Sequence, residues 1–330
     1  MRAIVQHKYG PPEQLSLREI DTPSPKAGEV LVKIHAAGVN DWDLGLLYGK
    51  PIFMRFFIGL FRPKIAIIGC EIAGVVEQIG SEVTRFKPGD KVYGDLSDSR
   101  FGGYAEFVSV RHDALAHMPS NLSFAQAVAI PHAGLLALQG LRDIAELSQG
   151  QSVLINGAGG GVGTLGLQYA KLFKARVAGV DSERKQEYMH LLSFDKVIDY
   201  EQEDYTESGI QYDIILDNKS THSPLKVIKA LKPGGIYLSI GGDSWRVTQY
   251  ALLKKWIFKR YNKRVAVLGL KPNKGLGELT GLVESGKLIP AVDKRYSLEE
   301  VPQAIRRFEE AKHCGKIVVL VAPNRRRDDE

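Results

Sequence analysis

Cysteine is scarce in this chain, and its N-terminal part lacks a long apolar run. Only Cys70 and Cys314 occur among 330 residues, which excludes a disulfide-rich secreted scaffold and a four-cysteine zinc site. The most apolar early stretch, residues 52–61, is interrupted by Arg55 and is far shorter than the roughly 18–20 residues that span a bilayer. The first residues also lack the apolar core of a signal peptide. We therefore expect a cytoplasmic protein, and its length favours two domains.

Acidic residues are absent from one short basic segment, residues 254–264. The net charge is +6, from 44 Lys+Arg and 38 Asp+Glu. Six cations lie in this segment, which leaves 38 bases against 38 acids elsewhere: Lys254, Lys255, Lys259, Arg260, Lys263 and Arg264. Trp256, Ile257 and Phe258 stand among them, which favours a surface helix that follows a strand end and loop over 241–253. Contact with lipid headgroups, nucleic acid or an anionic substrate stays open, although the chain shows no nucleic-acid-binding fold.

The pattern of secondary structure that the sequence predicts changes near Ser123. Before it, short β-prone runs at 3–8, 29–39 and 74–80 are separated by Gly/Pro clusters, which predicts a compact β-rich domain. After it, strands and helices alternate, which predicts an α/β domain with a parallel sheet covered on both faces. Strands are expected at 152–157, 175–181, 196–200, 212–217, 235–242, 264–270 and 315–321, and helices at 124–129, 134–144, 164–174, 224–230, 276–285 and 298–311. The polar residues 324–330 are expected to fray.

A glycine cluster, INGAGGGVG at 155–163, joins the predicted strand at 152–157 to a helix. Ala158, Gly160 and Gly163 follow the GxGxxG spacing with alanine first. One glycine permits the tight turn, the next lets the backbone approach a pyrophosphate, and the last lets helix and strand pack closely. The helix N-terminus then faces the phosphate charge. This context predicts a dinucleotide-binding turn of the Rossmann type, with contacts from Gly157, Ala158, Gly160, Gly161, Val162 and Gly163.

Asp181 ends the next strand, 18 residues beyond Gly163. A carboxylate at this position binds the ribose hydroxyls of NAD and repels the 2′-phosphate of NADP. Ser182, Arg184 and Lys185 follow directly and offer groups that hold that phosphate if Asp181 turns away. The residues alone therefore leave NAD and NADP open.

Several segments together resemble one known family. They are KYGPPEQL at 8–15, AAGVND at 36–41, the segment at 69–94 that begins GCEIAGVVEQIG, GGYAEFV at 102–108, AIPHAGLLALQGL at 129–141, the glycine cluster, KVIDY at 196–200 and GKIVVLV at 315–321. In this order they resemble the medium-chain dehydrogenase/reductase family, and most closely its zinc-independent quinone oxidoreductase branch. The resemblance implies a GroES-like domain over 1–123 with 271–330 and a Rossmann domain over 124–270. It also slightly favours NADP(H) and implies a homodimer that pairs through edge strands.

The zinc ligands of related alcohol dehydrogenases are altered here. Their cysteine position matches Asn40 and their histidine position matches Cys70, in the motif Gly69-Cys70-Glu71. A neutral asparagine is a poor zinc ligand, so we expect no metal, although Cys70, Glu71 and His132 leave an unusual site open. Without a Lewis acid, the resemblance implies hydride delivery from NAD(P)H to a quinone or to a C=C bond conjugated with a carbonyl.

The resemblance also implies the positions of site residues. Asn40 is the candidate polar group near the nicotinamide, Asp43 a residue that orients the Asn40 loop, and Tyr48 a candidate proton donor. Tyr48 lies three positions after the place where relatives carry a tyrosine, here Gly45. Further cofactor contacts are expected from Tyr200, Asn218, Ile240, Gly241, Gly242, Leu268, Gly269, Leu270 and Lys316. Two alternatives remain: an alcohol dehydrogenase that uses zinc, and a cofactor-binding protein whose main role is contact with membrane or RNA.

Overall fold

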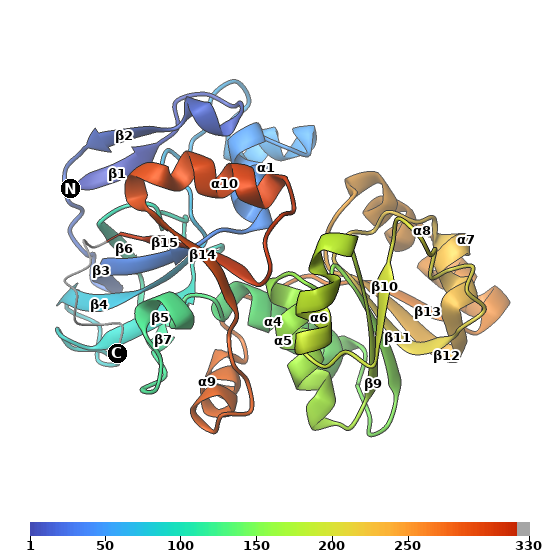
Figure 1. The fold of residues 1–330 in the computed structure, drawn as a ribbon. Helices are drawn as coiled ribbons and strands as arrows, with labels where there is room; N and C mark the ends of the chain where they lie inside the picture. The colour runs from blue at the N-terminus through green and yellow to red at the C-terminus, as the bar shows by residue number, and fades with distance from the viewer. Residues whose placement is uncertain (322–330) are drawn as a thin grey trace. The chain divides into compact units, whose positions relative to one another are not determined.

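The chain folds into two compact units in a computed structural model that describes residues 1–321 (Figure 1). The first unit comprises Met1–His132, Pro272–Ser285 and the chain from Pro290 onward, and the second comprises Ala133–Lys271 with Gly286–Ile289. The predicted fraying of residues 324–330 lies outside the described residues. Residues 124–132, which the sequence assigned to the second domain, pack with the first unit, where Phe124 stacks on His35 at 4.2 Å.

The first unit is built on a seven-stranded sheet and a small two-stranded one. The large sheet has the order β14-β15-β3-β4-β5-β7, with β6 also paired to β3, while β1 pairs with β2. The strands are β1 (Arg2–Val5), β2 (Ser16–Glu19), β3 (Glu29–Gly38), β4 (Glu71–Ile79), β5 (Lys91–Asp95), β6 (Phe107–Arg111), β7 (Ala116–His117), β14 (Val292–Ser297) and β15 (Lys316–Leu320). Its helices are α1 (Asp41–Tyr48), α2 (Arg55–Ile58), α3 (Phe124–Ala127), α9 (Leu276–Glu284) and α10 (Val301–Glu309).

Alternating side chains on β3 form the centre of this unit's core. Val30, Val32 and Ile34 are buried, whereas Lys33 between them is exposed, as expected for a strand with period-two side chains. The same cluster includes Ile305 of α10, whose helix packs against β15. The strand β3 ends at Gly38, where the chain turns into α1. The polar residues described below lie at this end of the strand.

The second unit is a parallel six-stranded sheet. Its order is β10-β9-β8-β11-β12-β13 and every pairing is parallel, with helices on either side of the sheet (Figure 1). The strands are β8 (Ser152–Asn156), β9 (Arg176–Asp181), β10 (Lys196–Asp199), β11 (Tyr212–Asp217), β12 (Leu231–Ser239) and β13 (Arg264–Val267). The helices are α5 (Gly161–Leu172), α6 (Gln186–Leu191), α7 (Pro224–Val227) and α8 (Ser244–Tyr261), and α4 (Pro131–Leu138) enters from the first unit. The predicted α/β fold, with a β-rich domain and a doubly wound sheet, is confirmed.

One predicted segment differs from the structure. The predicted strand end and loop over 241–253 is wrong, because α8 already begins at Ser244. The carboxylate of Asp243 accepts a hydrogen bond from the backbone N–H of Arg246 at 2.8 Å and so caps the helix N-terminus.

The stretch Phe124–Ile144 is long and apolar enough to cross a membrane, but most of it is buried inside the fold.

Candidate functional site

Three neighbouring strands of the first unit bring Asn40, Glu71 and Lys316 together. Strand β3 lies between β15 and β4, and Gly38 at its end pairs with Glu71 on one side and Val318 on the other. Asn40 follows β3, Glu71 opens β4 and Lys316 opens β15. A Cβ atom at position 38 would lie only 2.1 Å from Glu71 Oε1, so the missing side chain of Gly38 lets the Glu71 side chain cross the strand.

These three side chains form a closed hydrogen-bonded group away from water. The amide nitrogen of Asn40 donates to Glu71 Oε1 at 2.8 Å, and the Lys316 ammonium donates to Asn40 Oδ1 at 2.5 Å and to the backbone carbonyl of Val39 at 3.2 Å. Lys316 also pairs directly with Glu71, whose second oxygen accepts from the backbone N–H of His132 at 2.9 Å. Because the amide nitrogen and the amide oxygen of Asn40 each have a hydrogen-bond partner, the orientation of its amide group is defined.

Asp43 holds the loop that carries Asn40. It is fully buried in α1, and its carboxylate accepts from the backbone N–H groups of Asn40 at 2.8 Å and Gly69 at 3.0 Å. The hydroxyl of Tyr104 donates to it at 2.8 Å. Burial raises the pKa of Asp43 to about 6 despite these hydrogen bonds. These contacts connect Asp43 to the Asn40 loop, and its orienting role stays a prediction.

Tyr48 lies at the other end of α1 from Asn40. Its hydroxyl donates to a carboxylate oxygen of Glu309 at 2.7 Å. Burial and this carboxylate raise its pKa above 10, which makes the phenol a weaker acid than a free tyrosine. Its role as a proton donor stays a prediction.

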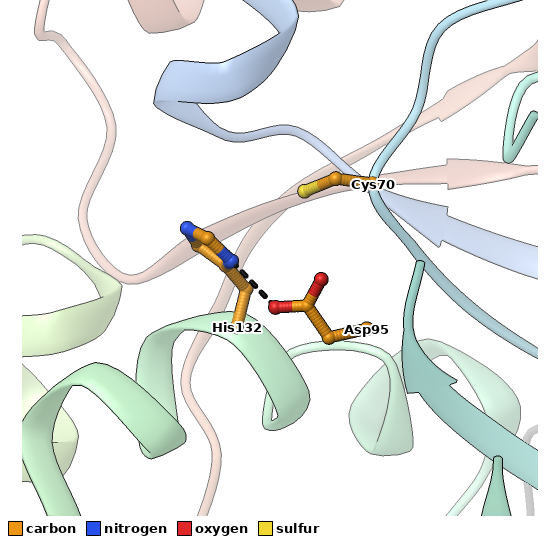
Figure 2. Close-up of side chains that lie close together, drawn as sticks. All are labelled: Cys70, Asp95 and His132. Carbon is orange, nitrogen blue, oxygen red and sulfur yellow. Dashed lines mark hydrogen bonds and ion pairs between the residues drawn. The ribbon is translucent and has the colours of Figure 1, made fainter. Parts of the chain in front are cut away.

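A second polar group lies beside the first and includes Cys70, Asp95 and His132. Their sulfur, oxygen and nitrogen atoms all lie within 4.8 Å of one another, and all three residues are buried. Figure 2 shows the Cys70 thiol pointing toward the imidazole, while His132 Nδ1 and Asp95 Oδ2 are 2.7 Å apart. Asp95 ends β5 opposite Glu71. The sequence grouped Glu71 with Cys70 and His132; in the structure the Glu71 side chain turns to Asn40 and Lys316 instead, and Asp95 takes its place.

Cysteine, histidine and aspartate can all ligate zinc; in the structure His132 and Asp95 are hydrogen bonded to each other and Cys70 lies beside them. Burial disfavours the charged imidazole, but the hydrogen bond and charge of Asp95 outweigh it and raise the pKa of His132 above 6.5. A metal ion that bound here would have to displace the proton from this imidazole. Burial, followed by the nearby carboxylates, raises the pKa of the Cys70 thiol well above 9, so metal binding would release this proton too and would depend on pH.

We predict that Asp95→Asn weakens the fold most at acidic pH. The contribution of protonated His132 is fully present below pH 6.5 and is lost as pH rises through its raised folded pKa. That of Asp95, whose net pKa is lowered by His132 in spite of burial, is present above pH 3.8 and is lost as pH falls through its folded pKa. Urea unfolding should therefore show a loss of about 1.5–3 kcal/mol at pH 5 and a smaller one at pH 9.

The control for this substitution is Asp113→Asn, which removes an exposed partner of Arg111. Solvent screens this pair, so the control should lower stability little at either pH. An equal loss for Asp95→Asn at pH 5 and pH 9 would contradict the charged pair.

In the second unit, the turn between β8 and α5 has the geometry that a dinucleotide requires. Gly157 has a φ of 81°, in the left-handed region that favours glycine. A Cβ atom at Gly163 would lie 2.3 Å from the backbone oxygen of Ala158, so helix and turn touch there. Gly160 is the N-cap of the 12-residue α5, and Gly161, Val162 and Gly163 form its first turn, whose backbone N–H groups lack partners within the helix.

The other predicted cofactor residues of this unit follow the carboxyl ends of its strands. Tyr200 follows β10, Asn218 follows β11, Ile240, Gly241 and Gly242 follow β12, and Leu268, Gly269 and Leu270 follow β13. Asn218 donates to the backbone oxygen of Asn156 at 2.9 Å, while its own Oδ1 is buried without a hydrogen-bond partner. An orphaned buried acceptor next to Gly157 suits a hydroxyl donor of a bound nucleotide, so the residues present fit this cofactor.

Asp181 already has three partners at the end of β9. Its carboxylate accepts from the backbone N–H groups of Gly159 at 2.9 Å and Ser182 at 3.0 Å, and it pairs with the buried Lys185 at 3.3 Å. Arg184 beside it is exposed. The charge of Asp181 is therefore largely neutralised from within the turn, a role for Lys185 that the sequence pattern did not reveal.

The predicted surface helix in the basic segment corresponds to the C-terminal half of α8. Ile257 is buried, whereas Lys254, Lys255, Lys259 and Arg260 are exposed. Trp256 and Phe258 are about half exposed between them. Contact of this helix with an anionic surface or substrate stays a prediction.

Comparison with known proteins identifies the family. Residues 26–120 match the family model of the alcohol dehydrogenase GroES-like domain, and residues 192–319 match that of the zinc-binding dehydrogenases. The chain is 33% identical to 2-methylene-furan-3-one reductase of Solanum lycopersicum, over 98% of this chain and 80% of the relative.

Two solved structures extend this likeness to the fold. The quinone oxidoreductase of Coxiella burnetii superposes with a TM-score of 0.86 at 29% identity, over 98% of this chain and 99% of the other. The Escherichia coli quinone oxidoreductase complexed with NADPH superposes with a TM-score of 0.85 at 25% identity, over 97% of this chain and all of the other.

The fold and the dinucleotide turn define a nicotinamide-dependent oxidoreductase. The chain belongs to the medium-chain dehydrogenase/reductase family, in its quinone oxidoreductase branch, as the resemblance predicted.

Proposed function

We propose that the protein reduces a quinone or an α,β-unsaturated carbonyl compound with NADPH and without a metal ion. The observation that carries this proposal is the closed group of Asn40, Glu71 and Lys316, in which Asn40 occupies the position that the resemblance assigns to a zinc-ligating cysteine. The relatives support the substrate class, since one is named for an exocyclic enone and two for quinones.

When bound, the nicotinamide supplies a hydride to the acceptor. The turn at Gly157–Gly163 and the first turn of α5 hold its phosphates through backbone N–H groups. The amide nitrogen of Asn40 carries two N–H groups, of which Glu71 takes one. In our proposal the second donates to the carbonyl oxygen of the acceptor and stabilises the negative charge that develops there. Lys316 and Glu71 keep that donor in place.

The test uses the purified full chain with NADPH, NADH, 9,10-phenanthrenequinone and simple enones. We expect turnover of at least one acceptor, far less than stoichiometric zinc by elemental analysis, and no loss of activity with a chelator. Stoichiometric zinc together with chelator-sensitive alcohol oxidation would support the alcohol dehydrogenase alternative. Tight NADPH binding without turnover of any acceptor would favour a binding protein.

We further propose NADP(H) as the preferred cofactor. Lys185 and two backbone N–H groups neutralise Asp181, so the carboxylate repels a 2′-phosphate less, and Ser182, Arg184 and Tyr200 are exposed or half-buried around it. Arg184→Ala should raise the KM for NADPH about tenfold or more and change that for NADH little. The matched control is Arg176→Ala at the opposite end of β9, which should change neither. Equal effects on both cofactors would contradict the proposal.

We retain the homodimer and the cytoplasmic location as proposals. The edge strand β13 is short, with four residues, and pairs on one side only within the described chain, which leaves its other edge for a second copy. Sedimentation of the purified protein tests the dimer, and fractionation of cells tests the location.

A further inference from the structure

The first unit exposes an unusual concentration of large apolar side chains on residues 50–64, which we name the aromatic segment. It consists of the short 3₁₀ turn Ile52–Met54, α2 and the residues after them. Phe61 is 86% exposed, and the other exposed apolar members lie between 46% and 73%: Ile52, Phe53, Phe56, Phe57 and Leu60. Soluble proteins seldom present such a contiguous apolar patch without a partner for it.

The inward side of the segment is already packed, so these rings cannot turn into the core. The Tyr9 hydroxyl donates to the backbone oxygen of Gly59 at 2.6 Å. The Arg55 guanidinium donates to the backbone oxygens of Gly49 at 3.1 Å and Tyr48 at 3.0 Å and lies over the Tyr9 ring. Ile58 packs against the core. A fixed backbone therefore holds the exposed side chains outward.

The segment is also cationic throughout. Between Asp43 and Glu71 the sequence contains no acidic residue and four basic ones, Lys50, Arg55, Arg62 and Lys64. Lys50, Arg62 and Lys64 are exposed. The patch thus combines exposed phenylalanine and aliphatic side chains with fixed positive charge.

We propose that the aromatic segment docks the protein on an anionic lipid bilayer. Aromatic and aliphatic side chains bury themselves among headgroups and upper acyl chains while cations bind anionic headgroups, which is the composition of interfacial membrane anchors. A second copy of the chain fits less well, because a two-fold dimer places the same patch against itself and would oppose cation to cation. RNA fits less well too, because Ile52 and Leu60 offer bases no stacking surface. The inference is independent of the substrate proposed above.

The experiment is vesicle flotation with the full chain. One set of vesicles is pure phosphatidylcholine and the other contains about one third phosphatidylglycerol, an anionic lipid whose negative surface potential attracts basic side chains. We expect binding to the anionic vesicles at about 0.1 M salt, at least tenfold weaker binding to neutral ones, and loss of binding at about 1 M salt. Equal binding to both vesicles, or none to either, would overturn the proposal.

Two sets of substitutions in the segment and two outside it locate the surface. Phe56→Ser with Phe57→Ser and Phe61→Ser, and separately Arg62→Glu with Lys64→Glu, should each weaken binding about tenfold or more. Leu191→Ser, at a residue of the second unit that is equally exposed, is the apolar control. Lys255→Glu with Lys259→Glu on α8 tests the other cationic surface, which this proposal expects not to contribute to vesicle binding. Both of these variants should bind as the unaltered chain does, and thermal unfolding checks that every variant is folded.

Loss of binding in the α8 variant alone would place the contact elsewhere and contradict the proposal. So would unchanged vesicle binding in both segment variants. If the protein does not bind vesicles but binds single-stranded RNA through Arg62 and Lys64, the partner of the segment is a nucleic acid and the proposal is wrong.

Discussion

Lys316→Met should lower the free energy of unfolding by about 3–5 kcal/mol, which is the usual cost of breaking a buried ion pair by removing one partner. Lys316 is 5% exposed and Glu71 is fully buried. Without the ammonium, the Glu71 carboxylate keeps only the hydrogen bonds from Asn40 and the backbone of His132. Asn40 Oδ1 loses its donor at the same time. Urea unfolding at neutral pH measures the effect.

A double substitution separates the charge from the shape of the side chains. Glu71→Gln in the Lys316→Met background removes the stranded charge while its amide oxygen still accepts from one of the two neighbouring donors, so stability should return by about 1–3 kcal/mol. Lys33→Met, on the exposed side of β3, is the matched control and should change stability by less than about 0.5 kcal/mol. If the double variant is no more stable than the single one, the charge of Glu71 is not the cause.

Gly163→Ala should weaken NADPH binding about 100-fold or more. An added Cβ would meet three backbone atoms of Ala158, at 2.3, 2.5 and 2.6 Å. Because backbone cannot swing aside as a flexible side chain does, either α5 or the turn must move. That displacement takes the first N–H groups of the helix away from the phosphates, and a 100-fold loss corresponds to about 2.7 kcal/mol. NADPH fluorescence titration measures the affinity.

The same helix offers a matched control for this glycine. A Cβ at Gly166 would meet only side chains, at 3.4 Å or more. Gly166→Ala should therefore leave NADPH binding intact, and the alanine should favour the helix by up to about 1 kcal/mol. NADPH should raise the Tm of this control as it does for the unaltered chain. If Gly163→Ala binds NADPH normally, the close approach at the turn is not needed for the cofactor.

The order of the elements could be predicted from sequence where local signals agree. Periodicity, the glycine cluster and Asp181 stand within one strand–turn–helix–strand unit, and the parallel sheet of the second unit follows from them. The helix at 244–253 was missed because its residues mix apolar and polar types without a sharp period. Asp243, three residues before the N–H that it caps, was the available signal.

The candidate site was only partly visible in the sequence, since it depends on strand register. The resemblance implied that Asn40 and Lys316 lie near the cofactor and that Asp43 orients the Asn40 loop. That Glu71 crosses β3 at Gly38, and that Asp95 rather than Glu71 pairs with the His132 imidazole, follows from the pairing of Glu71 with both Gly38 and Asp95. No local pattern encodes such pairing. Likewise, the exposure of residues 52–61 depends on how Tyr9, far away in sequence, fills their inner side.

Because the Glu71 side chain crosses β3 at Gly38, the residues at positions 38, 71 and 316 depend on one another. A side chain at 38 would displace the carboxylate from its place beside Lys316, and a neutral residue at 316 would make that carboxylate costly. Substitutions at the three positions are therefore expected to covary among homologous chains: glycine at 38 should accompany the glutamate and the lysine. A homologue without the charges at 71 and 316 should tolerate alanine or serine at 38, because its neighbouring strands can then pack with ordinary cross-strand side-chain contacts.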